Sequence, residues 1–168
     1  MNKKEALNKI EELKKYVAGL DANDDWVRID YSVIPKEVFD RYGAKPFEIM
    51  KRKMRRPDGT VWNVISFNDA KAEAQKLGYH LPSIQEHLVM LDWYLHEKGE
   101  KSSIYDKEFM GIEELSCNET VCFEWIDGPT TFIRGGNWNG GSFAGVETRY
   151  LSAAPGSAGS RVGFRCAR

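Results

Sequence analysis

The motif Arg134-Gly135-Gly136-Asn137-Trp138 opens the last 35 residues of the chain, and Val162-Gly163-Phe164-Arg165-Cys166 lies close to their end. Eight of the chain's 15 glycines fall in these residues, and no lysine does. Glycine loses more backbone entropy on folding than other residues do, so the segment needs rigid attachment at both ends. Large aromatic rings and ion-pairing arginines suit that role. The expected structural anchors are Arg134, Trp138, Phe164 and Arg165.

The whole chain has the length and composition of one globular domain. It has 168 residues, of which 42% are hydrophobic and 29% charged, which is enough to bury a core. Leucine, isoleucine and valine recur at helical spacing over residues 3–20, which predicts an amphipathic helix. We therefore expect an N-terminal helix in residues 1–22 and the domain in residues 23–168. The helix either docks on its own domain or mediates oligomerisation.

The predicted elements of the domain mix strands and helices, which favours an α+β fold. Ser66 with Asp69, and Ser83 with Glu86, are capping signals before two helices. Pro57-Asp58-Gly59 is a turn signal that predicts a β-hairpin, with the basic run 51–56 as a solvated strand face. The predicted strands are 26–34, 47–56, 60–66, 121–126, 131–134 and 161–167, and the predicted helices are 35–42, 66–77 and 83–98; residues 100–120 are expected to be a loop.

Charge and hydropathy exclude several classes of protein. The formal net charge of −1 argues against a general nucleic-acid binder. The last 35 residues nevertheless hold five arginines and one glutamate, a balance of +4 that could favour an anionic ligand. No apolar run of signal-peptide or membrane-spanning type is present. We expect no nucleic-acid partner, no membrane insertion, and synthesis in the cytoplasm, with a virion or cell surface as the alternative final location.

Candidate catalytic and metal-ligating residues do not form a recognisable arrangement. Cys117 and Cys122 are either a local disulfide or two unpaired thiols, and Cys166 is expected to be a small buried hydrophobe. The histidines lack the spacing of metal ligands; they are His80, His87 and His96. The sequence therefore predicts no catalytic residue, no metal and no cofactor.

Two further motifs extend the C-terminal pattern into a family resemblance. Leu81-Pro82-Ser83-Ile84-Gln85-Glu86 is similar to the Leu-Pro-Thr/Ser-x-x-Glu element of formylglycine-generating enzymes, and Phe123–Gly128 is similar to their Glu-Trp-Thr-Asp strand. With Arg-Gly-Gly-x-Trp and Gly-Phe-Arg, these matches cover roughly residues 60–168. The chain thus resembles the branch of C-type-lectin folds shared by formylglycine-generating enzymes and the variable proteins of diversity-generating retroelements. This resemblance implies an α+β C-type-lectin fold with an added N-terminal helix.

The two groups in this branch imply different functions. Formylglycine-generating enzymes hold copper with two cysteines spaced like Cys117 and Cys122, but that pair follows Arg-Gly-Gly-x-Trp in the family and precedes it here. Residues 135–146, 150–155 and 163–166 instead resemble the variable proteins. That resemblance implies a non-enzymatic recognition protein whose partner is an unknown protein or surface ligand. An oxidase of the formylglycine-generating class and an undiversified virion or surface structural module are the alternatives.

In variable proteins, asparagine codons are mutated at template adenines, so that side chains vary on a fixed scaffold. The resemblance implies a variable region at about residues 137–162. Randomising the first two bases of an asparagine codon ending in C never gives Lys, Glu, Gln, Met or Trp, so either Glu147 is scaffold or the template differs at that position. Phe143 and Tyr150 have core packing as an alternative role. The candidate ligand-binding positions are Gly140, Ser142, Phe143, Arg149, Tyr150, Ser152, Ala153, Gly156, Ala158, Ser160 and Arg161.

Overall fold

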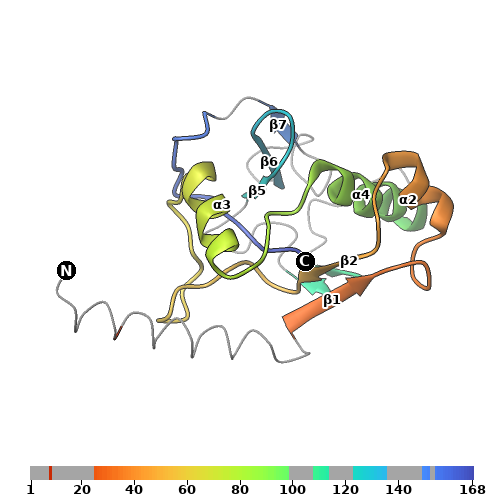
Figure 1. The fold of residues 1–168 in the computed structure, drawn as a ribbon, viewed down its shortest axis with the longest axis horizontal. Coiled ribbons are helices and arrows are strands. Elements are labelled where there is room, and N and C mark those ends of the chain that lie inside the picture. The colour runs from red at the N-terminus through yellow and green to blue at the C-terminus, as the bar shows by residue number, and fades with distance from the viewer. Residues whose placement is uncertain (1–7, 9–24, 99–107, 114–122, 136–148, 152–153) are drawn as a thin grey trace.

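The computed structural model describes residues 8, 25–98, 108–113, 123–135, 149–151 and 154–168. These residues form an α+β arrangement, as the sequence predicts, with three small sheets and three helices among the described ranges (Figure 1). In chain order the elements are β1 (Trp26–Ile29), α2 (Lys36–Tyr42), β2 (Phe47–Met50), α3 (Phe67–Lys76), α4 (Ile84–Lys98), β3 (Glu108–Phe109), β4 (Ile112–Glu113), β5 (Phe123–Ile126), β6 (Phe132–Gly135), β7 (Arg149–Leu151) and β8 (Val162–Gly163).

The largest sheet has the strand order β7-β6-β5-β8. β5 and β6 are antiparallel, with Glu124 opposite Arg134, and β8 joins the other edge of β5 in parallel. The sequence predicted the strands 121–126 and 131–134 and the return of the chain at 161–167, and each is confirmed within a few residues. The return places the C-terminal segment next to the central strand of the domain.

A second sheet pairs β1 with β2, and helices α2 and α4 pack against each other beside it (Figure 1). The predicted hairpin of 47–56 with 60–66 is confirmed next to its turn, where Arg55 bridges to Val61 and the amides of Arg56 and Trp62 donate to the carbonyls of Thr60 and Met54. It is wrong for residues 47–50, because β2 pairs with β1 instead. The reason lies at the other edge of β2. There the C-terminal residues bond to it, with the amides of Met50 and Met54 donating to the carbonyls of Cys166 and Phe164.

The predicted strand at 26–34 is too long, since β1 ends at Ile29. Asp30 then forms a turn in which its carboxylate accepts hydrogen bonds from the amide and hydroxyl of Ser32. Short acidic side chains favour such turns because they bond to the backbone two residues on. The alternation of apolar residues continues past this point, so pattern alone does not reveal the break.

The helix boundaries follow their capping residues. The hydroxyl of Ser66 accepts from the amide of Asp69 at 3.1 Å at the start of α3. Before α4 the box is reciprocal: the amide of Ser83 donates to Glu86 at 2.7 Å, and the amide of Glu86 donates back to Ser83 at 3.2 Å. Gly43 ends α2 in the left-handed conformation, with a φ of 66°. The three predicted helices of the domain are therefore confirmed.

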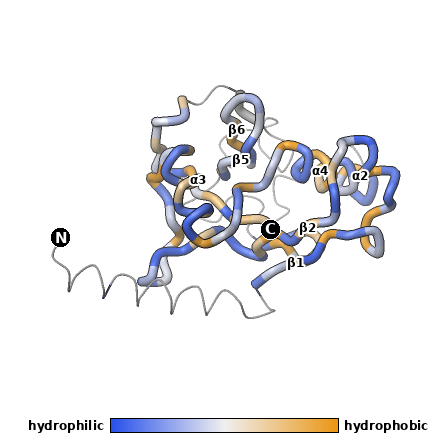
Figure 2. The backbone as a smooth tube through the Cα atoms, viewed as in Figure 1, coloured by the Kyte–Doolittle hydropathy of each residue, from blue (hydrophilic) through white to orange (hydrophobic). Residues whose placement is uncertain are grey.

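Among the residues that the structure describes, the core consists of two apolar clusters. The first gathers around Trp125 and Phe164, and the second lies between β1, β2, α2 and α4 and includes Phe39 and Tyr94. Figure 2 shows hydrophobic and hydrophilic residues interleaved along α2 and α4, as expected of helices that bury one face. The run 162–167 is buried throughout, so the C-terminal chain is part of the core.

Some predicted elements lie wholly or largely outside the described residues. The N-terminal helix falls on residues 1–7 and 9–24, apart from Asn8. In the predicted loop at 100–120, the described part forms the short hairpin of β3 and β4. Each helix in the described ranges is too short or too polar to span a bilayer.

Candidate functional site

The candidate recognition surface includes residues 154–161, which precede β8. Four predicted ligand-binding positions fall in this segment, and all four have exposed side chains or, for glycine, an exposed backbone: Gly156, Ala158, Ser160 and Arg161. A Cβ added at Gly156 would meet no atom within 4 Å. At Gly159, which is not a candidate position, a Cβ would lie 3.2 Å from the side chain of Val162. The space around Gly156 therefore accepts a side chain, whereas the space at Gly159 is tight.

The backbone of this segment is bound to the rest of the domain. The carbonyls of Pro155 and Gly159 accept hydrogen bonds from the amides of Asn68 and Val64 at 3.2 and 3.3 Å. The carbonyl of Ser160 accepts from the Asn63 side chain at 2.8 Å. Ala158 forms an antiparallel bridge with Ser66, and the carbonyl of Arg161 accepts from the amide of Phe123.

These contacts separate two roles within one stretch of chain. Main-chain groups fix the path of residues 154–161, and a main-chain hydrogen bond does not depend on the side chain that the residue carries. The side chains of Ala158, Ser160 and Arg161 are exposed, as is the backbone of Gly156. The geometry therefore permits changes of side chain without loss of the bonds that hold the segment in place.

A buried ionic cluster lies at the base of the C-terminal chain. We define the Glu124 cluster as Lys53, Glu124, Arg134 and Arg165, all of which are nearly inaccessible to solvent. Arg165 Nη2 is 2.6 Å from one Glu124 carboxylate oxygen, and Arg134 Nη2 is 2.9 Å from the other. Lys53 Nζ lies 3.7 Å from the carboxylate. The cluster joins β5, β6, the chain after β2 and the chain after β8.

The attraction of the cationic side chains in the cluster outweighs the effect of burial on the pKa of Glu124. Burial alone raises the pKa of Glu124, but the positive charges of Arg165, Arg134 and Lys53 lower it to well below its usual range. Glu124 is therefore ionised at neutral pH. The pKa of Arg134 is lowered, because burial and repulsion from Arg165 outweigh the attraction of Glu124.

Arg165 also binds the backbone of two other segments. Its Nη1 donates to the carbonyls of Met50 and Lys51 at 3.0 and 3.1 Å, and its Nη2 donates to the carbonyl of Glu113 at 2.9 Å. Phe164, next to it, packs edge-on against Trp62. Arg134, Phe164 and Arg165, predicted as structural anchors, are thus buried at the points where the C-terminal segment joins the sheet.

The structure does not describe every predicted position. Arg149 and Tyr150 lie on β7, and only their backbone is described. Outside the described residues are the anchor Trp138, the proposed scaffold residue Glu147, the cysteines Cys117 and Cys122, and the candidate positions Gly140, Ser142, Phe143, Ser152 and Ala153. The structure therefore shows candidate positions exposed together on one segment only for residues 156–161.

Two members of the cluster were missed by sequence reasoning. Lys53 was expected on the solvated face of a basic strand, but its side chain is buried beside Glu124. Its neighbours Arg52 and Arg55 are at least partly exposed, so the basic run as a whole did not indicate that Lys53 is buried. For Glu124 a signal existed, since it is an acidic residue between Phe123 and Trp125 in a predicted strand, and buried carboxylates require a partner.

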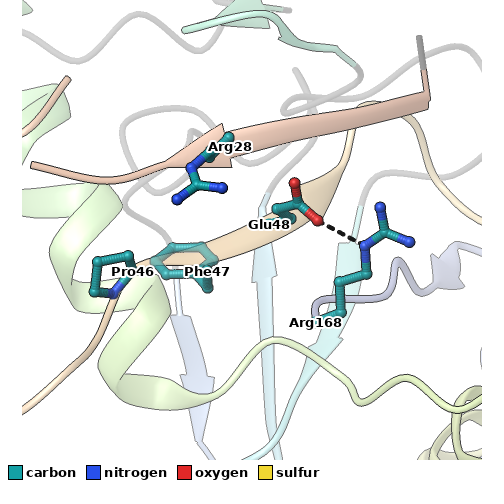
Figure 3. A pocket seen from close by; sticks show the side chains of 5 residues that line it. All are labelled: Arg28, Pro46, Phe47, Glu48 and Arg168. Atoms are coloured by element: carbon teal, nitrogen blue, oxygen red, sulfur yellow. Dashed lines mark hydrogen bonds and ion pairs between the residues drawn. The ribbon is translucent and has the colours of Figure 1, made fainter. Parts of the chain in front are cut away.

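A separate surface pocket lies at the sheet of β1 and β2 (Figure 3). Arg28 comes from β1, Phe47 and Glu48 from the start of β2, Pro46 from the residue before it, and Arg168 from the C-terminal end. Arg168 is paired with Glu48 at 2.7 Å and Arg28 with Asp30 at 2.7 Å. Arg168 also lies over the ring of Trp26, 4.4 Å from its centroid. Both arginines have acidic partners in the chain, so this pocket presents little unbalanced charge to a ligand.

The described residues show no arrangement suited to metal binding. Within the part of the chain that the structure covers, no three His, Cys, Asp or Glu side chains gather as potential ligands. Cys166 is buried, as predicted, and burial raises the pKa of its thiol to about 12, which suppresses the reactive thiolate.

A scan against protein-family models gives no match for this chain, and neither does a search of curated proteins.

Proposed function

We propose that this protein is a non-enzymatic recognition protein that binds a protein or surface ligand through diversified C-terminal side chains. In this proposal the α+β domain is a C-type-lectin fold similar to formylglycine-generating enzymes, and its variable region spans about residues 137–162. The protein needs no cofactor and does not bind nucleic acid. It acts in the cytoplasm or on a virion or cell surface.

One observation carries the proposal: exposed side chains on a backbone that the domain holds by main-chain bonds. Gly156, Ala158, Ser160 and Arg161 are exposed, while the carbonyls of Pro155, Gly159, Ser160 and Arg161 are all hydrogen-bonded. Recognition loops on rigid domains have this property, because they must vary in sequence without altering the fold. Arginine contributes strongly to binding, and small polar residues supply adaptable contacts.

The decisive test of diversification is the DNA around the coding sequence. We expect a reverse-transcriptase gene nearby, and a near-copy of the segment encoding residues 137–162 that differs only where the copy has adenine. The codons for Gly156, Ala158, Ser160 and Arg161 should be among the differing ones. A flanking sequence without such a copy would overturn diversification and favour the undiversified structural module.

A combinatorial library tests the physical premise on the protein itself. We would randomise positions 156, 158, 160 and 161 with the codons reachable from asparagine, display the variants, and select for resistance to protease. Most members should remain folded, with melting temperatures within about 2 °C of the original, since exposed substitutions typically change stability by less than about 0.5 kcal/mol. A matched library at the buried positions Val162, Phe164, Cys166 and Ala167 should lose most of its folded members. Equal losses in both libraries would contradict the proposal.

A further inference from the structure

Val64 is the most exposed of the large apolar residues in the described part of the chain. It is 58% exposed, and its φ of 54° lies in the left-handed region, which β-branched residues rarely adopt. Glycine or asparagine would adopt this conformation more easily. Because an exposed valine also gains little from packing, the interior of the domain does not account for this residue.

Arg56 holds the backbone of residues Val61–Val64, which we call the Val64 connection. Its Nη1 donates to the carbonyl of Val61 at 2.9 Å, and its Nη2 donates to the carbonyl of Asn63 at 2.8 Å. A strained backbone persists only where its surroundings fix it, and strained residues concentrate at functional sites. The Val64 connection is therefore a candidate for a role in binding.

The Val64 connection lies beside residues 154–161. The amide of Val64 donates to the carbonyl of Gly159 at 3.3 Å. The side chain of Asn63 donates to the carbonyl of Ser160 at 2.8 Å. These bonds make the exposed Val64 a neighbour of the exposed candidate positions, so a ligand bound to residues 156–161 lies within reach of it.

This surface carries two arginines that form no ion pair with any described residue. Arg161 is exposed, and the Arg56 guanidinium bonds to carbonyl oxygens of the Val64 connection. The nearby carboxylate of Asp58 accepts hydrogen bonds from the amide and hydroxyl of Thr60 instead. A carboxylate from a partner can therefore pair with Arg161 without displacing an acidic residue of this chain.

We propose that the Val64 connection is a constant part of the recognition surface, and that its partner is a protein segment in which an apolar side chain contacts Val64 and a neighbouring carboxylate pairs with Arg161. The inference rests on the proposed function, since it concerns the partner of the same surface. Protein interfaces combine apolar residues with arginine in this way, because the apolar contact excludes water from the charged pair. A nucleic acid or a free phosphate would pair with the arginines but would leave Val64 in water.

A displayed library of random peptides, selected for binding to the immobilised full chain, tests the proposal. The selected peptides should be enriched in Asp or Glu next to large apolar residues. Val64→Asn and Arg161→Gln should each raise the Kd of these peptides about tenfold, since burial of a valine and pairing of a charge each contribute about that factor. The controls Val33→Asn and Arg28→Gln make the same changes at exposed residues of the β1 region and should leave the Kd unchanged.

Two results would overturn the proposal. One is a set of selected peptides without this enrichment, and the other is a Kd that Val64→Asn does not change. Circular dichroism checks that each variant is folded, as expected for exposed substitutions.

Ala158→Tyr separates failure of this inference from failure of the proposed function, because it adds a bulky side chain at an exposed candidate position. If Ala158→Tyr weakens binding and Val64→Asn does not, residues 154–161 bind the ligand without the Val64 connection, and only this inference fails. If neither variant changes the Kd, the peptides bind elsewhere, which contradicts both.

Discussion

Glu124 joins segments that are distant in sequence but adjacent in the fold. Its carboxylate lies within 3.0 Å of groups on Arg134 and Arg165, and Lys53 is close by. Because β5 pairs with both β6 and β8, one side chain on β5 can reach cations from either side. The cluster is thus a direct consequence of strand order, with Glu124 opposite Arg134 in the ladder and opposite Gly163 on the other edge.

Removal of this carboxylate should be severely destabilising. Glu124→Gln preserves the shape of the side chain but leaves the buried cations without the charge that they share, and breaking such a buried pair costs about 3–5 kcal/mol. Urea unfolding at neutral pH measures the loss. The control Glu48→Gln removes the partly exposed pair with Arg168 and should cost about 1 kcal/mol or less. Similar losses in both variants would show that burial adds nothing to the importance of Glu124.

The same residue should make stability depend on pH in the acidic range. The pKa of Glu124 in the folded protein lies below its ordinary value of 4.5, so the stability that its charge contributes is complete above about pH 4.5 and is lost as the pH falls further. The difference in unfolding free energy between the original chain and Glu124→Gln should therefore shrink on acidification. Urea titrations between about pH 7 and pH 3 measure that difference, and a constant difference would refute this assignment. Other carboxylates titrate in both proteins and cancel.

At the scale of elements, the connection between Val61 and α3 supports the C-terminal segment. Asn63 and Val64 both donate hydrogen bonds to it, to the carbonyls of Ser160 and Gly159. Val64 adopts a φ of 54° and the residue is 58% exposed. A β-branched residue is strained in this left-handed conformation, so the connection makes its two contacts with residues 154–161 at a cost in backbone energy.

Replacement of Val64 should reveal that strain. Asparagine tolerates the left-handed conformation, and little apolar burial is lost at this exposed position. Val64→Asn should therefore raise the free energy of unfolding by about 1 kcal/mol, as measured by urea denaturation. Val33→Asn is the matched control, because Val33 is 41% exposed and has no positive φ; it should change stability by about 0.5 kcal/mol or less. Destabilisation at both positions would indicate that the valine side chain matters more than the backbone.

The elements that depend on local chemistry could be predicted from the sequence. Capping residues such as Ser83 with Glu86 act within one turn of chain, and glycines such as Gly43 end helices through their own conformation. Strand pairing could not be predicted in the same way. β2 pairs with β1 and contacts the C-terminal residues, whereas the turn at 57–59 suggested residues 60–66 as its partner. The buried role of Lys53 depends on Glu124, which is distant in sequence, so no local pattern could indicate it. The exposure of Gly156 and Arg161 was expected from the resemblance to variable proteins, which implies ligand-binding positions there, and both residues are exposed.

At the scale of the whole molecule, the last residues connect parts of the domain that are far apart in the chain. Arg168 exchanges backbone hydrogen bonds with Glu48, and Ala167 exchanges them with His80. The carbonyls of Cys166 and Phe164 accept hydrogen bonds from the amides of Met50, at the end of β2, and Met54, after it, while Arg165 joins the Glu124 cluster. In Figure 1 the C-terminus accordingly lies beside β2. The segment that presents the exposed positions therefore leads directly into residues on which the fold depends.

A shortened chain tests that dependence. A protein that ends at Gly163 loses the buried Phe164 and Arg165, two of the groups that connect the sheets, and removal of a core aromatic residue alone costs about 3–5 kcal/mol. This is a large fraction of the 5–15 kcal/mol that typically stabilises a domain, so we expect no cooperative unfolding transition by circular dichroism in urea. A chain that ends at Ala167 loses only Arg168, which lies at the surface, and should still unfold cooperatively. If the shorter chain retained a cooperative transition with an unchanged midpoint, the C-terminal residues would be an addition to an independent domain, and the exposed segment before them would lack its rigid attachment.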